Sequence, residues 1–130
     1  MTTKNFTYND LRIIKNEILG LAQIGEDKTQ KVLIVGLKNE DVTLGVSHRL
    51  NKIVAKIDEE FKVLEVSLKE IKGDEKDEGA QAKRAELWSQ ETELSYEPIS
   101  FDKIDNLSLR KNFLGEKYDY DFLIKSICEE

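Results

Sequence analysis

The feature that most constrains this chain is a regular apolar seam between residues 44 and 71. Its apolar residues recur at intervals of four and three: Leu50, Val54, Ile57, Phe61, Leu64, Leu68 and Ile71. This heptad spacing places the side chains on one stripe of a helix, and such a stripe needs another helix to cover it. No Pro or Gly interrupts the segment after Gly45, and Asp41 or Thr43 is suited to cap its start. The spacing predicts one long helix, about 40 Å at about 1.5 Å per residue.

A glycine-bounded polar run, Gly73 to Gly79, follows this helix. Because it has no apolar side chain to bury, we interpret it as a solvated hairpin tip. Its carboxylates suggest a divalent-cation loop as an alternative, although they lack the order of ligands found in an EF-hand. Ala80 to Gln90 is again rich in good helix formers. We therefore expect a mainly α fold, built on an antiparallel helical hairpin or coiled coil.

The N-terminal part of the chain predicts a further helix. Thr7 is suited to the N-cap and Asp10 to the third helical position, and the apolar stripe that follows ends at Gly25. The next segment, residues 28–39, is ambiguous because periodicity does not separate a buried strand from a buried helical turn. We favour a short helix there, since no neighbouring segment offers a strand to pair with.

The C-terminal part predicts a short strand, a turn and a helix. Apolar and polar residues alternate from Thr92 to Glu97, which is typical of a strand, and Pro98 ends the pattern. Residues 120–128 carry the apolar side chains of a last helix. At 130 residues the chain is expected to form a single domain, with the N-terminal helices in 1–78 and the return helix, strand and aromatic region in 79–130.

The charge is unevenly distributed and argues against nucleic acid as a partner. The formal net charge is −6, and the whole acidic excess lies in residues 66–130. Phosphate contacts need a positive surface, which this half does not offer. No apolar run approaches the length of a signal peptide core or of a bilayer span, so we expect no membrane partner and a soluble protein.

The residues that usually carry chemistry are sparse. His48 is the only histidine and Cys128 the only cysteine, about 80 residues apart, so no paired metal ligands arise from them. The sequence contains no phosphate-binding glycine loop and no nucleophile elbow. Neighbouring acidic residues would raise rather than lower the pKa of the Cys128 thiol. We therefore expect no catalytic residue, no metal and no cofactor, and a protein that is not an enzyme.

Apolar and aromatic residues are the candidates for interaction. Seven of the ten Phe, Tyr and Trp residues fall in the last third of the chain, and aromatics anchor both cores and interfaces. Two valines, Val63 and Val66, lie off the seam, where a coiled coil is usually polar. They are either ordinary exposed residues or part of a contact surface. The candidate interaction residues are Phe61, Val63, Val66, Trp88, Tyr96, Phe113, Tyr118 and Phe122.

The order of elements resembles a known family. The residues that carry the resemblance are the run Leu37–Leu44, then Arg49–Val54, Glu91–Leu94, Glu97–Asp102, Phe122–Ile124 and the terminal Glu129 and Glu130. Over residues 37–130 this pattern is similar to small, uncharacterised helical-hairpin proteins encoded by tailed bacteriophages. The resemblance implies a phage protein that is found in the host cytoplasm or the virion, and it brings no site residues with it.

Two functions are compatible with these features. The first is a phage structural or assembly protein that associates through its helices, either with itself as a homo-oligomer or with a virion component in a larger assembly. The second is a small acidic phage regulator or inhibitor that binds a host protein, using its acidic half against a basic surface. In both cases the expected partner is a protein.

Overall fold

The computed structural model describes residues 2–24, 30–105 and 120–129, together with positions 26, 28 and 115. The elements, in chain order, are β1 (Thr2–Thr7), α1 (Tyr8–Leu19), β2 (Leu21–Ile24), β3 (Gln30–Ile34), the short 3-10 turn η1 (Leu37–Asn39), α2 (Leu44–Lys69), α3 (Glu78–Trp88), β4 (Glu91–Tyr96), β5 (Ile99–Ser100), α4 (Asp102–Asp105), α5 (Asp121–Ile127) and β6 (Cys128–Glu129). The described residues form a small mixed α/β domain, in which helices are combined with two-stranded sheets. The mainly α prediction therefore describes the helices and misses most of the strands.

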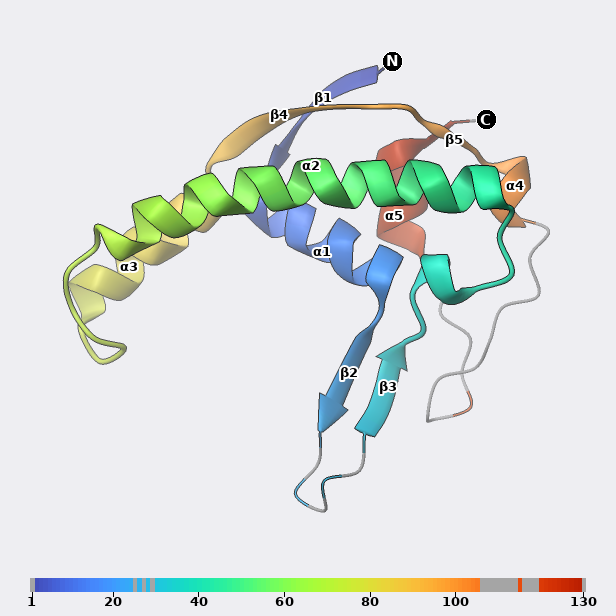
Figure 1. The fold of residues 1–130 in the computed structure, drawn as a ribbon. Coiled ribbons are helices and arrows are strands. Elements are labelled where there is room, and N and C mark those ends of the chain that lie inside the picture. The colour runs from blue at the N-terminus through green and yellow to red at the C-terminus, as the bar shows by residue number, and fades with distance from the viewer. Residues whose placement is uncertain are drawn as a thin grey trace.

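The long helix α2 confirms the central prediction and extends along most of the molecule (Figure 1). Thr43 caps it, because its hydroxyl oxygen accepts a hydrogen bond from the backbone N–H of Val46 at 3.3 Å. The helix ends at Lys69, two residues before the predicted end at Ile71.

The apolar stripe of α2 faces a core shared with several elements. Its buried residues are Val46, Leu50, Ile53, Ile57 and Leu64. Val54 and Phe61 on the predicted seam are only partly buried. The buried stripe includes Ile53 because a helix that packs on a globular core keeps its own period of about 3.6 residues rather than the 3.5 of a supercoil. The most extensive contacts of α2 are with α1, β4 and α3, so this is a domain core rather than a long helix–helix seam.

The sheet β1–β4 lies above α2 in Figure 1. The two strands are antiparallel, and their register runs from Thr2 opposite Tyr96 to Thr7 opposite Glu91. The predicted strand at 92–97 is thus confirmed as β4, shifted by one residue. Its partner β1 was not predicted, because the two strands lie far apart in the sequence: β1 ends at Thr7 and β4 begins at Glu91.

Helix α1 begins as predicted and ends earlier. The Thr7 hydroxyl accepts from the Asp10 N–H and the Asp10 carboxylate accepts from the Thr7 N–H, both at 3.1 Å, which completes a capping box. The helix ends at Leu19, where Gly20 adopts a φ of 97°. The predicted continuation of this helix to Gly25 is wrong, because Leu21–Ile24 form the strand β2.

The short helix favoured for residues 28–39 is wrong over most of that range. Residues 30–34 form β3, which pairs antiparallel with β2 in a hairpin that projects away from the rest of the molecule (Figure 1). The partner strand was concealed in the supposed end of the first helix. Gly20 and Gly36 close the base of the hairpin: a methyl group on Gly20 would lie 2.8 Å from the carbonyl oxygens of Ile34 and Val35, and Gly36 has a φ of 88°.

The C-terminal elements complete the domain. Helix α3 starts at the cap Asp77 and lies beneath the distal end of α2, after the exposed run 73–79 (Figure 1). The predicted last helix is confirmed as α5, and β6 follows it and pairs parallel with β5. Figure 1 places both chain termini on the same side of the molecule.

Candidate interaction surface

The distal part of α2 and the end of α3 hold an aromatic pair. The rings of Phe61 and Trp88 meet edge to face, with centroids 5.9 Å apart and an interplanar angle of 63°. Helix α1 adds two cations: the guanidinium of Arg12 lies 5.2 Å from the Trp88 ring centroid, and the ammonium of Lys15 lies 5.6 Å from that of Phe61. A cation over an aromatic face is attracted by the ring and contributes about 0.5–1 kcal/mol at an exposed site. Three helices therefore meet at this pair.

A groove of about 610 Å³ opens beside the aromatic pair. Its floor is apolar and its rim charged; the lining residues are Lys15, Asp58, Phe61, Lys62, Leu64, Glu65, Leu68 and Trp88. An ion pair at 2.6 Å joins Lys15 of α1 to Asp58 of α2 at the rim. Apolar floors with polar rims are typical of protein contact sites.

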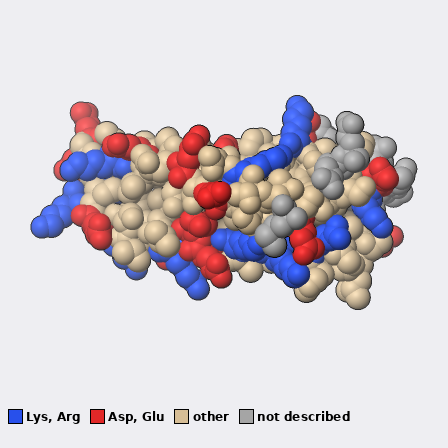
Figure 2. Space-filling view, turned by 90° about the horizontal axis from the view of Figure 1, so that it is seen from above, with Lys and Arg blue, Asp and Glu red and all other residues tan. Residues whose placement is uncertain are grey.

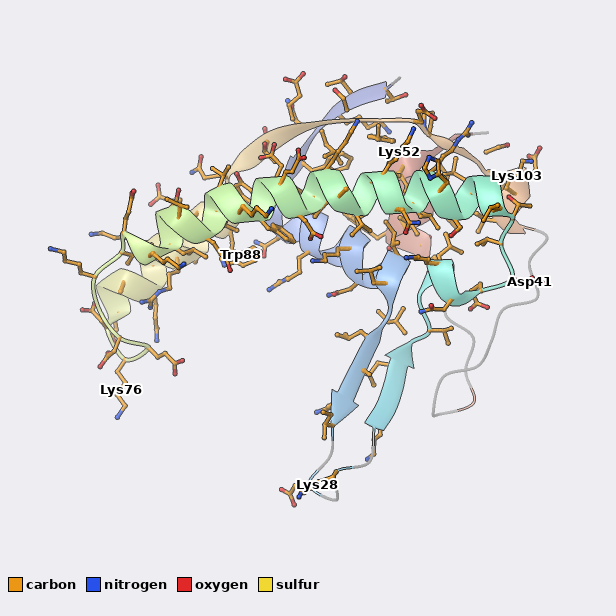
Figure 3. All side chains as sticks on the ribbon, viewed as in Figure 1. Lys28, Asp41, Lys52, Lys76, Trp88 and Lys103 are labelled. Atoms are coloured by element: carbon orange, nitrogen blue, oxygen red, sulfur yellow. The ribbon has the colours of Figure 1, made fainter. Side chains whose placement is uncertain are left out.

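The opposite side of α2 carries the two valines that the sequence singled out. Val63 and Val66 are each 60% exposed, and their spacing of three residues places them on the same side of the helix. In Figure 3, Trp88 of α3 is labelled below α2 and Lys52 of α2 is labelled above it. The distal half of α2 thus carries apolar side chains on two opposite sides, with charged residues between them.

Charge is segregated along α2. Residues 44–57 contain three cations, Arg49, Lys52 and Lys56, and no acidic residue, whereas residues 58–70 contain five acidic residues and two lysines. Glu97, which follows β4, lies 3.6 Å from Arg49 and 4.0 Å from Lys52. Figure 2 shows basic and acidic side chains gathered in separate groups near the middle of the upper face. The helix therefore has a basic half and an acidic half.

A smaller hollow of about 390 Å³ lies between the basic half of α2 and β4. Arg49 and Lys52 line it, and the ammonium of Lys56 donates to the carbonyl oxygen of Ser95. Tyr96 and Glu97 form its other wall. The cations of α2 are thus held beside the strand rather than free to rotate away from it.

The remaining candidate residues fall into different environments. Tyr96 is buried, and its ring is tilted against that of Phe6 with the ring centroids 6.3 Å apart. Its hydroxyl donates a hydrogen bond to the carbonyl oxygen of Ser126 at 2.9 Å. Phe122 is partly buried against the core. Phe113 and Tyr118 lie outside the described residues. Among the candidate residues that the structure describes, Phe61 and Trp88 are in contact, whereas Val63 and Val66 lie on the other side of α2.

The single histidine and the single cysteine of the sequence lie far apart along the chain. His48 is exposed on α2. Burial raises the pKa of the Cys128 thiol to about 11, so the thiol is protonated at neutral pH. Within the described ranges no three His, Cys, Asp or Glu side chains are grouped to hold a metal ion. Nor does any helix there have both the length and the apolar character needed to cross a membrane.

Two buried carboxylates were missed by the sequence reasoning. Glu17 of α1 is 1% exposed and accepts a hydrogen bond at 2.6 Å from the backbone N–H of Leu123. Glu40 is also buried and accepts from the Tyr120 hydroxyl at 2.9 Å. Both join the C-terminal segment to the N-terminal half. The available signal was the position of Glu17 within the apolar stripe of α1, where a charged residue needs a partner.

Comparison of the chain with protein families, with curated proteins and with solved structures found no match.

Proposed function

We propose that this chain is a non-enzymatic bacteriophage structural or assembly protein that acts by helix-mediated association with itself or with a virion component. The phage context rests on the order of sequence elements across residues 37–130. The association rests on the structure of the distal half of α2. In this proposal the protein works in the host cytoplasm or the virion.

The observation that carries the proposal is the apolar character of both sides of distal α2. Its inner side holds the partly buried Phe61 above the open groove, and its outer side holds Val63 and Val66. The described element beneath this part is the short α3, which reaches only one side. Burying apolar area stabilises by about 25 cal/mol per Å², so covering the outer side favours association. Here α2 and α3 act as an antiparallel helical hairpin that forms a coiled-coil contact with its partner.

Mass spectrometry of purified virions and of proteins that copurify from infected cells tests the phage role directly. The proposal expects the chain in virions or bound to a virion component. A chain that is absent from virions and copurifies with no phage protein would contradict it. Substituting Val63→Lys together with Val66→Lys should abolish the association. Leu44→Lys is the matched control, because Leu44 is 87% exposed at the other end of α2.

A second candidate function is a small acidic regulator that binds a basic surface of a host protein. The observation that favours it is the outward row of Glu91, Glu93 and Glu97 along and just beyond β4, all exposed. Binding of this kind weakens steeply with added salt, whereas association through apolar helix faces does not. A pull-down from host lysate at low and high salt separates the two functions.

A further inference from the structure

The β2–β3 hairpin is fixed at its base and uncovered beyond it. The side-chain amide of Asn39 donates to the carbonyl oxygen of Leu19 at 3.2 Å and to that of Val35 at 2.9 Å, so it joins the two ends of the hairpin. Ile34 packs against the domain core. Among the described residues the extensive contacts of β2 are with β3 alone, and the hairpin projects from the domain (Figure 1). An isolated two-stranded hairpin is only marginally stable in water, and a third strand stabilises it.

The outer edge of β2 is open. Within the described ranges β2 pairs with β3 and with no other strand. Hydrogen-bonded and non-bonded pairs alternate in an antiparallel ladder, so every second residue of β2 directs its N–H and its C=O away from β3. Leu21 pairs with Ile34 and the next residue with Val32, so the extra residue of the irregularity lies in β3 and β2 alternates regularly. The edge therefore offers a row of backbone donors and acceptors that an extended chain matches.

The sequence of β2 does not protect this edge. Edge strands are commonly guarded by charged side chains or by proline. The longer strands β1, β3 and β4 contain Lys4, Lys31 and Glu93, respectively. Strand β2 contains no charged residue and no proline, and its four side chains are all exposed. Its composition therefore favours the addition of a strand.

The exposed apolar side chains of β2 indicate the shape of the partner. Leu21 is 41% exposed and Ile24 is 73% exposed, and their odd spacing puts them on opposite faces of the hairpin. A helix laid on one face would cover only one of them. A strand added at the edge extends both faces, so its own side chains lie beside both residues.

We propose that the outer edge of β2 binds an extended, uncharged segment of a partner protein as a third strand of this sheet. The segment pairs through its backbone, and its apolar side chains contact Leu21 on one face and Ile24 on the other. This edge is separate from the outer side of α2, so the inference goes beyond the proposed function and does not depend on it. A strand of four residues at about 3.3 Å each spans only about 13 Å, so the binding is expected to be weak.

A capped peptide of alternating threonine and valine, added to the isotopically labelled full chain, tests the inference by nuclear magnetic resonance. Chemical-shift changes and slower amide exchange should appear in β2. The same peptide with every backbone nitrogen methylated should bind about tenfold more weakly or less, because it donates no hydrogen bond to the edge. Leu21→Lys together with Ile24→Lys should weaken binding similarly, because both charges lie at the edge. Leu44→Lys, at an 87% exposed leucine of α2, is the control and should bind as the wild type does.

The amide spectra of the free variants establish that each is folded. Changes that fall outside β2, equal binding of the methylated peptide, or no change in β2 up to millimolar peptide would overturn the inference. Slower exchange in β2 on concentrating the chain alone would mean that a second copy occupies the edge, which would overturn the choice of a separate partner. The Val63→Lys and Val66→Lys double variant retains β2 and should still bind the peptide, so a failure of this inference is distinguishable from a failure of the proposed function.

Discussion

Glu17 offers the sharpest test of how the C-terminal helix is held to the domain. Helix α5 begins at Asp121, and its N-cap residue Tyr120 adopts a left-handed conformation with a φ of 53° and makes no side-chain cap hydrogen bond. The carboxylate of Glu17 in α1 accepts a hydrogen bond from the N–H of Leu123, the third residue of α5. Glu17 therefore replaces the N-cap side chain that usually accepts from a free N–H in the first turn of a helix. Leu123 itself is fully buried, so no water replaces the missing acceptor.

The magnitude follows from this geometry. A hydrogen bond to a charged group contributes about 1.5–3 kcal/mol, and a buried N–H left without an acceptor costs about 1–3 kcal/mol. We expect Glu17→Ala to lower the free energy of unfolding by about 2–4 kcal/mol. Glu17→Gln keeps the size and one acceptor oxygen and loses the charge, so about 1–2 kcal/mol is expected.

Urea unfolding followed by far-ultraviolet circular dichroism measures both variants, with Glu86→Gln on exposed α3 as the control. The expected order is control, then Gln, then Ala, from smallest to largest loss. A loss below about 1 kcal/mol for Glu17→Ala would refute the assignment of Glu17 as the cap of α5, because removing a buried acceptor leaves the Leu123 N–H unsatisfied and costs about 1–3 kcal/mol.

Phe61 is only partly buried, so Phe61→Ala should lower the free energy of unfolding by less than the roughly 3–5 kcal/mol typical of a fully buried aromatic. In the same assay the fully buried Ile57 should lose about 2–5 kcal/mol on change to Ala, which is more than Phe61→Ala loses. The reverse order would contradict the placement of the core. Gly20→Ala should destabilise the base of the β2–β3 hairpin, because the added methyl group would lie 2.8 Å from two carbonyl oxygens and because residue 20 has a positive φ. Faster amide hydrogen exchange in β2 and β3 would report this loss. Unchanged exchange rates would contradict the role given to Gly20. Limited proteolysis should cut first within residues 73–79, which are all exposed, and a resistant run would argue against an open tip. Burial raises the pKa of the Cys128 thiol from 9.0 to about 11, so its thiolate fraction at mildly alkaline pH is about 100-fold lower than that of an exposed cysteine. Alkylation of Cys128 should therefore be slow in the folded chain and fast in urea. Equal alkylation rates in the folded and unfolded chain would be inconsistent with its burial.

Local signals were readable from the sequence. The Thr7 and Asp10 capping box, the cap at Thr43 and the alternation of Leu94 and Tyr96 each lie within a few residues of the element they define, and each is found in the structure. The long helix was predicted for the same reason, since its apolar spacing is contained within it.

The missed features depend on distant partners. Leu21–Ile24 fits the end of an apolar helix as well as a strand, and the choice is made by pairing with β3 and by the turn at Gly20. Apolar and polar residues alternate only weakly in β1, and this strand forms because it pairs with β4, which is distant in the sequence. The groove could not be assembled from sequence either, because Arg12 and Lys15 reach the aromatic pair from another helix. Tertiary contact outweighs local propensity in each case.

The central claim is that this chain works by association through its long helix, and sedimentation velocity of the purified wild type tests it most directly. Across the micromolar range, the account predicts that the average mass rises from the monomer value of 15.0 kDa toward twice that value. The Val63→Lys and Val66→Lys double variant should stay at the monomer mass while remaining folded. A wild type that is strictly monomeric at every concentration, alone and mixed with purified virion components, would contradict the account.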